Sequence, residues 1–415
     1  MADYFVIKGE KKLEGEISIG NAKNASLKIL AASILARGPI KIPNLPQIED
    51  ISRMKELLID LGTKFDSESL NSTRIKKTDL NYKIANRFRA SIVLTGPILT
   101  RYGRVSFPHP GGCILGKRPI NFFIDGFKAF GARVQKTGQI FTVSSKKLIG
   151  GKFVFPNVSV TGTENMMMAA TLAKGKTILK NSACEPEIEN LAAFLNSLGA
   201  KISGAGTPTL EIEGVDALSG GTWNGMPDRI EAGTFIILAA ATKSHLKIKN
   251  CNPNHLDVLL TLLQNAGVNI EIGNNYVIVR PSKKLKAIDI KTREYPGFAT
   301  DLQAPFTVLL TQSEGISLVH ETIYDGRLFY TDILNQMGAD IIMADPHRVI
   351  VRGPTKLHGK KIHSPDIRAG MALIIAALIA KGESVVDNIY QIDRGYEKID
   401  ERLKAIGADI TRIKN

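Results

Sequence analysis

The sequence predicts a mixed α/β protein of two domains, each made of three copies of one repeated unit with helices inside and sheets outside. Three observations predict this fold. The chain has 415 residues, more than one hydrophobic core usually supports. A short motif, in which an apolar residue, a glycine and a small residue precede a strand-like alternation, occurs six times. Several helix-like runs are apolar on nearly every face, and such helices are buried on every side.

The glycines of the six motifs are spaced 69, 68, 68, 71 and 69 residues apart, at Gly62, Gly131, Gly199, Gly267, Gly338 and Gly407. We expect each to end a helix and a strand to follow, because glycine takes the left-handed conformation without strain. A second element, an apolar run with a turn and a strand, places its turn 23 to 28 residues earlier, at Gly38, Gly103, Gly175, Ser244, Gly315 and Gly382. Six units of about 69 residues therefore fill the chain.

The apolar helices are expected over 166–173, 235–241 and 371–380, and the Met-rich run in the first is core filling. The equivalent helices begin near Lys23, Arg89, Thr163, Arg229, Asp301 and Arg368. Four of these six starts carry a basic residue, where the helix dipole disfavours a cation. Local rules are broken mainly at functional sites, so we expect these cations to face a bound phosphate or carboxylate. The alternative is that they extend into solvent.

Acidic residues also stand at these helix starts. Asp228 and Asp366 follow prolines in a pattern typical of helix caps, and we assign both a mainly structural role. Asp301 is either a further cap or, as the acidic member of a ring of cations, a general base.

The segment 109–119 contains three glycines and two prolines in eleven residues, which is typical of an exposed, shaped loop. Cys113 lies in this loop, and the nearby Lys117 and Arg118 favour its thiolate, so we predict a reactive thiol. Cys184 and Cys251 have no such setting and are assigned to structure. Three cysteines without Cys-x-x-Cys spacing predict neither a disulfide framework nor a zinc site.

The charge balance, 54 basic against 40 acidic residues, gives +14 and indicates anionic partners. Nucleic acid is disfavoured, because aromatic residues are only 6% and the basic residues are scattered. The longest apolar run, 369–380, holds 12 residues, too few to span a membrane, and the first residues do not read as a secretory signal, so we expect a cytoplasmic protein. The sequence contains no Walker loop, nucleophile elbow or His/Cys metal cluster, and a transferase or lyase acting on phosphorylated compounds fits best.

Eight short motifs occur in order along the chain: Gly20-Asn21-Ala22-Lys23-Asn24-Ala25, Arg89-Ala90-Ser91, Gly111-Gly112-Cys113 with Arg118-Pro119, Glu185-Pro186-Glu187-Ile188, Pro227-Asp228-Arg229-Ile230-Glu231, Thr300-Asp301-Leu302-Gln303, Asp366-Ile367-Arg368-Ala369 and Ile392-Asp393-Arg394-Gly395-Tyr396-Glu397. Over the full chain they resemble the enolpyruvyl transferases that act on UDP-N-acetylglucosamine. The resemblance implies two pseudo-threefold inside-out α/β barrel domains, one over 21–226 that carries the Cys loop and one over 1–20 and 227–415, with the active site in the cleft between them.

The resemblance implies transfer of enolpyruvyl from phosphoenolpyruvate to the 3′-hydroxyl of UDP-N-acetylglucosamine with release of phosphate, the first committed step of peptidoglycan biosynthesis, without cofactor or metal. It makes Cys113 the acid that protonates phosphoenolpyruvate and Asp301 the base that takes the sugar hydroxyl proton. Family cysteines also form a covalent adduct with phosphoenolpyruvate and are alkylated by fosfomycin. The implied substrate-binding residues are Lys23, Asn24, Arg89, Arg118, Pro119, Ile120, Asn121, Phe122, Asn157, Val158, Ser159, Val160, Ile323, Arg327, Arg368 and Arg394.

The chain departs from the family pattern at a few positions. Phe123 and Gln391 stand where the family commonly has histidine, and Asn121 and Asn157 replace commonly charged residues. Three alternatives therefore stay open: a diverged paralogue with another sugar nucleotide, an enolpyruvyl transferase acting on shikimate 3-phosphate, and a non-catalytic anion-binding or RNA-binding protein.

Overall fold

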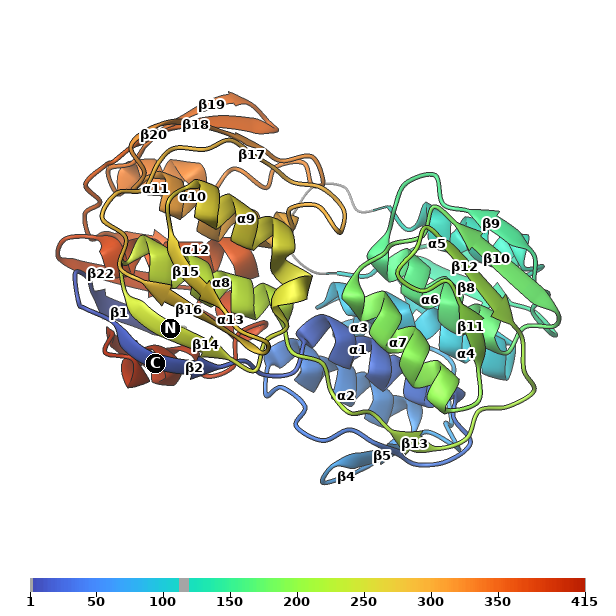
Figure 1. The fold of residues 1–415 in the computed structure, drawn as a ribbon. Coiled ribbons are helices and arrows are strands. Elements are labelled where there is room, and N and C mark those ends of the chain that lie inside the picture. The colour runs from blue at the N-terminus through green and yellow to red at the C-terminus, as the bar shows by residue number, and fades with distance from the viewer. Residues whose placement is uncertain (1–2, 112–118, 415) are drawn as a thin grey trace. The chain divides into compact units, whose positions relative to one another are not determined.

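The computed structural model describes residues 3–111 and 119–414. These residues form two compact units, shown as ribbons in Figure 1. The terminal unit consists of 3–20 and 227–414, and the inner unit consists of 21–111 and 119–226.

The described strands of the terminal unit form three sheets of four strands, in the orders β21-β22-β1-β23, β15-β16-β14-β2 and β17-β18-β20-β19. The strands are β1 (Tyr4–Lys8), β2 (Glu14–Ser18), β14 (His245–Lys249), β15 (Asn269–Ile272), β16 (Tyr276–Arg280), β17 (Ile290–Lys291), β18 (Gly315–His320), β19 (Asp340–Asp345), β20 (Arg348–Gly353), β21 (Lys361–His363), β22 (Glu383–Asp387) and β23 (Asp409–Ile413). The helices are α8 (Arg229–Ala241), η3 (Pro253–Leu256), α9 (Asp257–Asn265), α10 (Thr300–Leu310), α11 (Thr331–Gln336), α12 (Ile367–Ile379), α13 (Tyr390–Asp393) and α14 (Ile399–Ala405).

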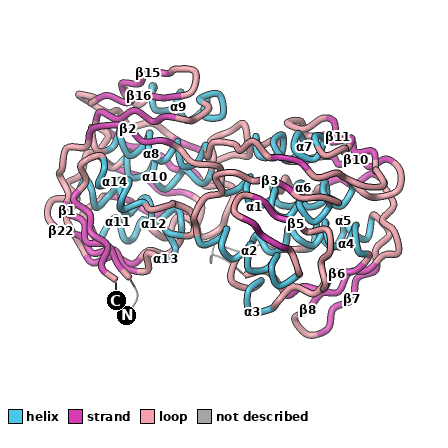
Figure 2. The backbone as a smooth tube through the Cα atoms, turned by 90° about the horizontal axis from the view of Figure 1, so that it is seen from below, coloured by secondary structure: helices cyan, strands magenta, loops and turns pink. Residues whose placement is uncertain are grey.

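Three apolar helices, α8, α10 and α12, occupy the interior of the terminal unit, and α10 packs against both of the others. Every residue from Arg368 to Leu378 in α12 is buried, as a helix that is apolar on all faces requires. The strands lie around these helices (Figures 1 and 2). Strand β1 pairs antiparallel with both β22 and β23, so the first strand of the chain completes a sheet made by its last residues.

The inner unit has the same kind of organisation. Its described strands form sheets in the orders β11-β12-β10-β9, β13-β3-β5-β4 and β6-β8-β7. The strands are β3 (Ile40–Lys41), β4 (Lys64–Asp66), β5 (Ser69–Asn71), β6 (Arg104–Pro108), β7 (Arg133–Thr137), β8 (Ile140–Ser144), β9 (Lys152–Val154), β10 (Lys176–Lys180), β11 (Lys201–Ser203), β12 (Thr209–Glu213) and β13 (Gly221–Thr222). The helices are α1 (Lys23–Ala32), η1 (Ser33–Leu35), α2 (Glu49–Leu61), α3 (Tyr82–Ala85), η2 (Arg89–Leu94), α4 (Thr95–Tyr102), α5 (Asn121–Ala129), α6 (Val160–Thr171) and α7 (Pro186–Ser197).

The core of the inner unit is built around α1, α4 and α6. The methionine run of α6, Met166 to Met168, is completely buried in it, which confirms the expected role in core filling. Each unit therefore has a hydrophobic core of its own.

All six repeat glycines adopt positive φ, between +82° at Gly131 and +111° at Gly62, as helix ends in the left-handed conformation require. The earlier turns differ in two copies. Gly38 does not have a positive φ, and in the fourth copy Lys243, not Ser244, takes the left-handed position with φ +51°. Two helix starts also differ: Arg89 begins a 3₁₀ segment that leads into α4, and α6 begins at Val160, so Thr163 lies inside its first turn.

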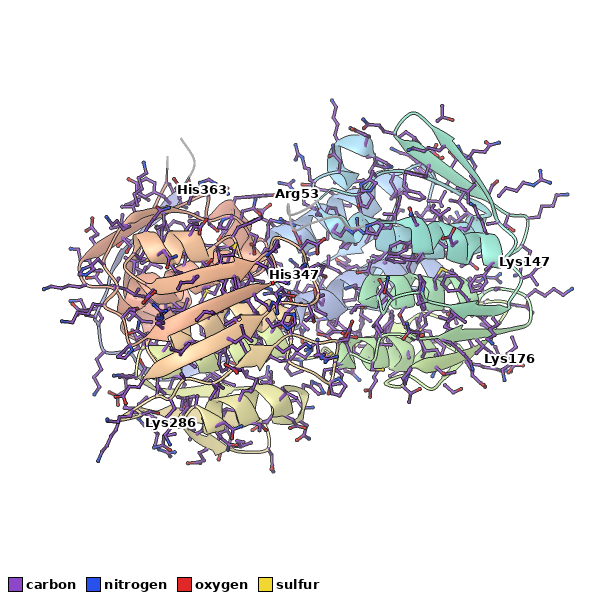
Figure 3. The ribbon with its side chains drawn as sticks, turned by 90° about the horizontal axis from the view of Figure 1, so that it is seen from above. Arg53, Lys147, Lys176, Lys286, His347 and His363 are labelled. Carbon is purple, nitrogen blue, oxygen red and sulfur yellow. The ribbon has the colours of Figure 1, made fainter. Side chains whose placement is uncertain are left out.

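Basic side chains are spread over the surfaces of both units. Lys147 and Lys176 of the inner unit and Lys286 of the terminal unit are exposed and are labelled in Figure 3. Over 3–111 and 119–414, no helix has the length and apolarity needed to cross a membrane.

Candidate active site

Asp301 lies in the first turn of α10, but it does not cap the helix. The cap position of α10 is Ala299, which makes no side-chain cap bond, and the Asp301 carboxylate turns instead to two arginines. Its Oδ1 accepts from Arg327 Nη2 at 2.8 Å, and its Oδ2 accepts from Arg368 Nε at 3.0 Å. Of the two readings left open by the sequence, the cap is therefore wrong.

The two guanidinium groups are almost completely buried, whereas the Asp301 side chain keeps 27% of its surface exposed. Burial by itself raises the pKa of Asp301, but the charges of Arg368 and Arg327 outweigh this and hold that pKa well below its usual range. Asp301 is therefore an ionised carboxylate that can still be reached from solvent.

Arg368 is held from the other side by an aromatic hydroxyl. Its Nη1 donates to Tyr396 Oη at 3.2 Å, and Tyr396 Oη lies 3.1 Å from Thr234 Oγ1 of α8. This buried chain links Thr234 of α8 with Arg368 at the start of α12, and through Arg368 with Asp301 at the start of α10. Tyr396 lies in the motif 392–397, but nothing in the sequence assigned it a role. Only the packing of distant segments brings it to Arg368.

Asp228 and Asp366 are helix caps, as predicted. Asp228 Oδ1 accepts from the backbone N–H groups of Ile230 and Glu231, both at 2.9 Å. Asp366 Oδ1 accepts from the N–H groups of Arg368 and Ala369 at 2.8 and 3.0 Å. The second cap fixes the first turn of α12, and with it the backbone that carries Arg368.

Arg394 follows α13 and is buried. Its Nη1 donates to Gln391 Oε1 at 2.9 Å. The glutamine that departs from the family pattern is thus a hydrogen-bond acceptor for a predicted substrate-binding arginine.

Ile323 is half-buried in the segment after β18, and its backbone N–H donates to Glu321 Oε1 at 2.8 Å. Glu321 is completely buried, and nothing in the sequence distinguished it. Its second oxygen accepts from Thr300 Oγ1 at 2.8 Å, so it connects the Ile323 segment with the start of α10.

In the inner unit, Lys23 stands at the start of α1 and is buried. Its Nζ lies 2.7 Å from Asp50 Oδ2 of α2, a partner that sequence reasoning missed. Asn24, the next residue, is half-buried. A buried lysine whose carboxylate partner compensates its charge can be held at a helix start despite the dipole.

The remaining inner-unit residues form two neighbouring segments. Arg89 Nη2 donates to the carbonyl of Pro119 at 3.4 Å, which brings η2 to the start of the 119–122 segment. Phe122 lies against Gly162, where an added Cβ would approach its ring to 2.9 Å, so this segment also meets the start of α6. The 119–122 segment and the 157–160 segment consist of Pro119, Ile120, Asn121, Phe122, Asn157, Val158, Ser159 and Val160.

Within these segments Asn121 and Asn157 are exposed, Val158 and Val160 are half-buried, and Ser159 caps α6 by accepting from Gly162 N at 3.1 Å. Phe123 is only 1% exposed, so this departure from the family pattern faces the core of the inner unit. Its ring centroid is 4.6 Å from that of Phe122.

Cys113 and Arg118 lie outside the described residues. Burial raises the pKa of the Cys251 thiol to about 11, and burial together with Glu185 and Glu189 raises the pKa of Cys184. Both thiols are therefore less reactive than an ordinary cysteine at neutral pH, in agreement with their structural assignment. Among the residues that the structure describes, no group of three or more His, Cys, Asp or Glu side chains is arranged to hold a metal ion.

A family model described as EPSP synthase (3-phosphoshikimate 1-carboxyvinyltransferase) matches residues 7–403. The chain therefore belongs to this family of enolpyruvyl transferases. Within it, the chain is 42% identical, over 100% of its own length and 96% of the relative's, to a UDP-N-acetylglucosamine 1-carboxyvinyltransferase from Coxiella burnetii (strain RSA 493 / Nine Mile phase I). A protein of the same name from Solibacter usitatus (strain Ellin6076) is 43% identical, with 99% of this chain and 100% of the relative covered.

Solved structures give the same fold. The enolpyruvyl transferase NikO from Streptomyces tendae superposes with a TM-score of 0.90 at 21% identity, with both chains covered completely. An EPSP synthase from Acinetobacter baumannii superposes with a TM-score of 0.75 at 18% identity, again over the whole of both chains. At these identities the likeness concerns the fold alone.

Proposed function

We propose that this chain transfers the enolpyruvyl group of phosphoenolpyruvate to the 3′-hydroxyl of UDP-N-acetylglucosamine with release of phosphate, the first committed step of peptidoglycan biosynthesis. The observation that carries the proposal is the carboxylate of Asp301 held between Arg327 and Arg368 at the starts of buried helices. Full-length relatives at 42% identity that carry the name of this activity support the choice of acceptor.

In the proposed reaction the sugar oxygen bonds to C2 of phosphoenolpyruvate while its proton passes to Asp301. Cys113 donates a proton to the methylene carbon, which makes C2 electrophilic. The Cys113 thiolate then takes a proton back from the methyl group of the resulting tetrahedral intermediate, and the bond from C2 to the phosphate oxygen breaks. The products are the enolpyruvyl ether and inorganic phosphate.

Arg327 and Arg368 also control how strong a base Asp301 is in this scheme. A carboxylate paired with two cations is a weak base, because both pairs stabilise its ionised form. When an anionic substrate takes up part of the interaction with Arg327 and Arg368, the pKa of Asp301 rises and it becomes a better proton acceptor. Binding of the anion thereby prepares the base, and the same cations stabilise the charge of the intermediate.

The proposed substrate contacts follow from the family resemblance and from side-chain chemistry. Lys23, Arg118 and Arg394, together with Arg327 and Arg368, are the proposed cations for phosphoenolpyruvate. Asn24, Arg89, Ile323 and the segments 119–122 and 157–160 are the proposed contacts of the UDP-sugar. Cys113 is also the proposed site of a covalent phosphoenolpyruvate adduct and of alkylation by fosfomycin. Cys113 and Asp301 lie far apart along the chain. The proposed reaction requires both of them to reach the same bound substrate.

We also propose that each unit is a pseudo-threefold domain with helices inside and sheets outside, with domain boundaries after residues 20 and 226. Three sheets per unit support this, as do six repeat glycines with positive φ. The repetition explains why α8, α10 and α12 begin at equivalent places and present Asp301 and Arg368 to one another.

The test is release of inorganic phosphate from phosphoenolpyruvate with UDP-N-acetylglucosamine, with shikimate 3-phosphate and with no acceptor. We expect release only with the UDP-sugar. Cys113→Ala and Asp301→Asn should each lower the rate by about 100-fold or more, as loss of a general acid or base does. Asp340→Asn, on the outer strand β19, is the matched control and should keep the wild-type rate.

Three outcomes contradict the proposal. Release that depends on shikimate 3-phosphate assigns the chain to the activity named by the family model. Folded wild-type protein without release on either acceptor points to another sugar nucleotide or to a non-catalytic role. Salt-dependent RNA binding without phosphate release supports the non-catalytic alternative.

A further inference from the structure

Glu321 directly follows β18 and is completely buried, yet the proposed reaction gives it no step. Four donors surround its carboxylate. Oε1 accepts from Thr292 Oγ1 at 3.0 Å, from Ile323 N at 2.8 Å and from Tyr324 N at 3.2 Å, and Oε2 accepts from Thr300 Oγ1 at 2.8 Å. All four contacts are donated to the carboxyl oxygens, so both oxygens of Glu321 act as acceptors.

The Thr300 hydroxyl connects Glu321 with Arg327 through hydrogen bonds. The hydroxyl of Thr300 has one hydrogen, which it donates to Glu321, and its oxygen accepts from Arg327 Nη1 at 2.9 Å. The second nitrogen of the same guanidinium, Nη2, donates to Asp301 Oδ1 at 2.8 Å. Because a guanidinium is planar and rigid, fixing Nη1 on Thr300 also fixes the direction in which Nη2 meets Asp301.

The Glu321 carboxylate also holds the backbone segment that places Tyr324 beside Arg327. By accepting from two successive backbone N–H groups it folds the segment that carries Ile323 and Tyr324. The Arg327 guanidinium carbon lies 5.3 Å from the centroid of the Tyr324 ring. His347, in the turn between β19 and β20 and labelled in Figure 3, also holds this segment, since its Nδ1 lies 3.1 Å from the Glu321 carbonyl oxygen.

We propose that Glu321 is a positioning residue, which acts through the Thr300 hydroxyl and the 323–324 backbone to aim Arg327 at Asp301. The consequence for activity rests on the proposed function, whereas the placement of Arg327 does not. Glu321 touches no reacting atom in this scheme. Its contribution is to keep the base and its cation in the geometry that the proton transfer needs.

The first test compares Thr300→Val, which keeps the shape and removes the hydroxyl, with Thr300→Ser, which keeps the hydroxyl. We expect Thr300→Val to lower kcat by about 10- to 100-fold with a smaller change in the KM for UDP-N-acetylglucosamine, as misplacement of a catalytic group does. Thr300→Ser should restore kcat to within about threefold of wild type, and Glu321→Gln should lower kcat in the same direction as Thr300→Val.

Thr311→Val is the matched control, because the Thr311 hydroxyl also makes a hydrogen bond, to the Val308 carbonyl, at the opposite end of α10. It should keep the wild-type kcat while losing comparable thermal stability. Equal loss of kcat in Thr300→Val and Thr311→Val, or no rescue by serine, would overturn the proposal.

A crystallographic comparison separates this inference from the proposed function. In Thr300→Val we expect the contact between Arg327 Nη2 and Asp301 Oδ1 to be lost, and in Thr300→Ser we expect it to be kept. If wild type releases no phosphate with any acceptor, the proposed function fails while these structures still decide the positioning role. If Arg327 keeps its place in Thr300→Val, the positioning role is wrong whatever the activity.

Discussion

Arg394 and Gln391 show at the scale of single residues how an uncommon side chain can preserve a site. The amide oxygen of Gln391 accepts from Arg394 Nη1 at 2.9 Å, within the reach of an ordinary hydrogen bond. A histidine in its neutral form also offers one acceptor nitrogen. The departure at position 391 therefore changes the chemical group and keeps the acceptor.

This equivalence can be tested by substitution at position 391. Gln391→Leu removes the acceptor, and loss of a hydrogen bond to a charged group costs about 1.5–3 kcal/mol, so we expect kcat/KM for phosphoenolpyruvate to fall by about 10- to 100-fold. Gln391→His should stay within about threefold of wild type. Steady-state kinetics of both variants measure this, and equal losses in the two would show that the acceptor is not what matters.

At the scale of elements, Lys28 of α1 and Glu164 of α6 face each other in the interior of the inner unit. Lys28 Nζ lies 3.2 Å from Glu164 Oε2, and Glu164 is completely buried. Burial raises the pKa of Glu164 to about 8. Lys28 acts against this rise, and the negative charges of Glu187 and Glu185 add to it. A carboxyl group with its pKa raised by folding binds its proton more tightly in the folded protein, so its contribution to stability depends on pH.

The sign of this dependence follows from the raised pKa. The stability that Glu164 contributes is fully present below its ordinary pKa of 4.5 and is lost as the pH rises through about 8. Glu164→Gln mimics the protonated form, so relative to wild type it should gain at least about 1.4 kcal/mol between pH 5 and pH 9, the equivalent of one pKa unit. Denaturant unfolding at both pH values measures this.

Glu213→Gln is the control for the pH series, because Glu213 is exposed and pairs with Lys201 on the surface of the inner unit. It should change by less than about 0.5 kcal/mol over the same range. A Glu164→Gln variant that follows wild type at both pH values would refute the buried titration.

At the scale of the whole molecule, a net charge of +14 is shared between exposed lysines and the buried cations of the site. Long-range attraction of anions by surface charge is screened at high salt, whereas buried cations are screened much less. The two contributions can therefore be separated by ionic strength.

We expect a rise from about 0.05 to 0.5 M NaCl to increase the KM of both anionic substrates several-fold with little change in kcat, because the Debye length shrinks well below 10 Å. The double variant Lys147→Gln/Lys176→Gln removes two exposed charges that are not among the proposed substrate contacts and should leave KM within about twofold of wild type. A KM that is independent of salt would show that surface charge does not guide these substrates.

The sequence by itself determined the repeated architecture and the ends of many elements. Glycine at each repeat position stops a helix because the left-handed conformation strains other residues, and all six positions have positive φ. Helices that are apolar on every face have no stable place outside a core, which determined that α8 and α12 are buried. The caps Asp228 and Asp366 were also readable, because capping acts over two or three residues.

Only the tertiary structure decided which side chains meet. The sequence left open whether Asp301 is a helix cap or a general base. Its partners Arg327 and Arg368 lie 26 and 67 residues away along the chain. Glu321 and Asp50 had no signal in the sequence, and Tyr396 lay in a motif without an assigned role, because their roles depend on buried contacts with other segments. Local periodicity determines where helices begin, end and face, whereas the pairing of charges across helices depends on how the buried helices pack into one core.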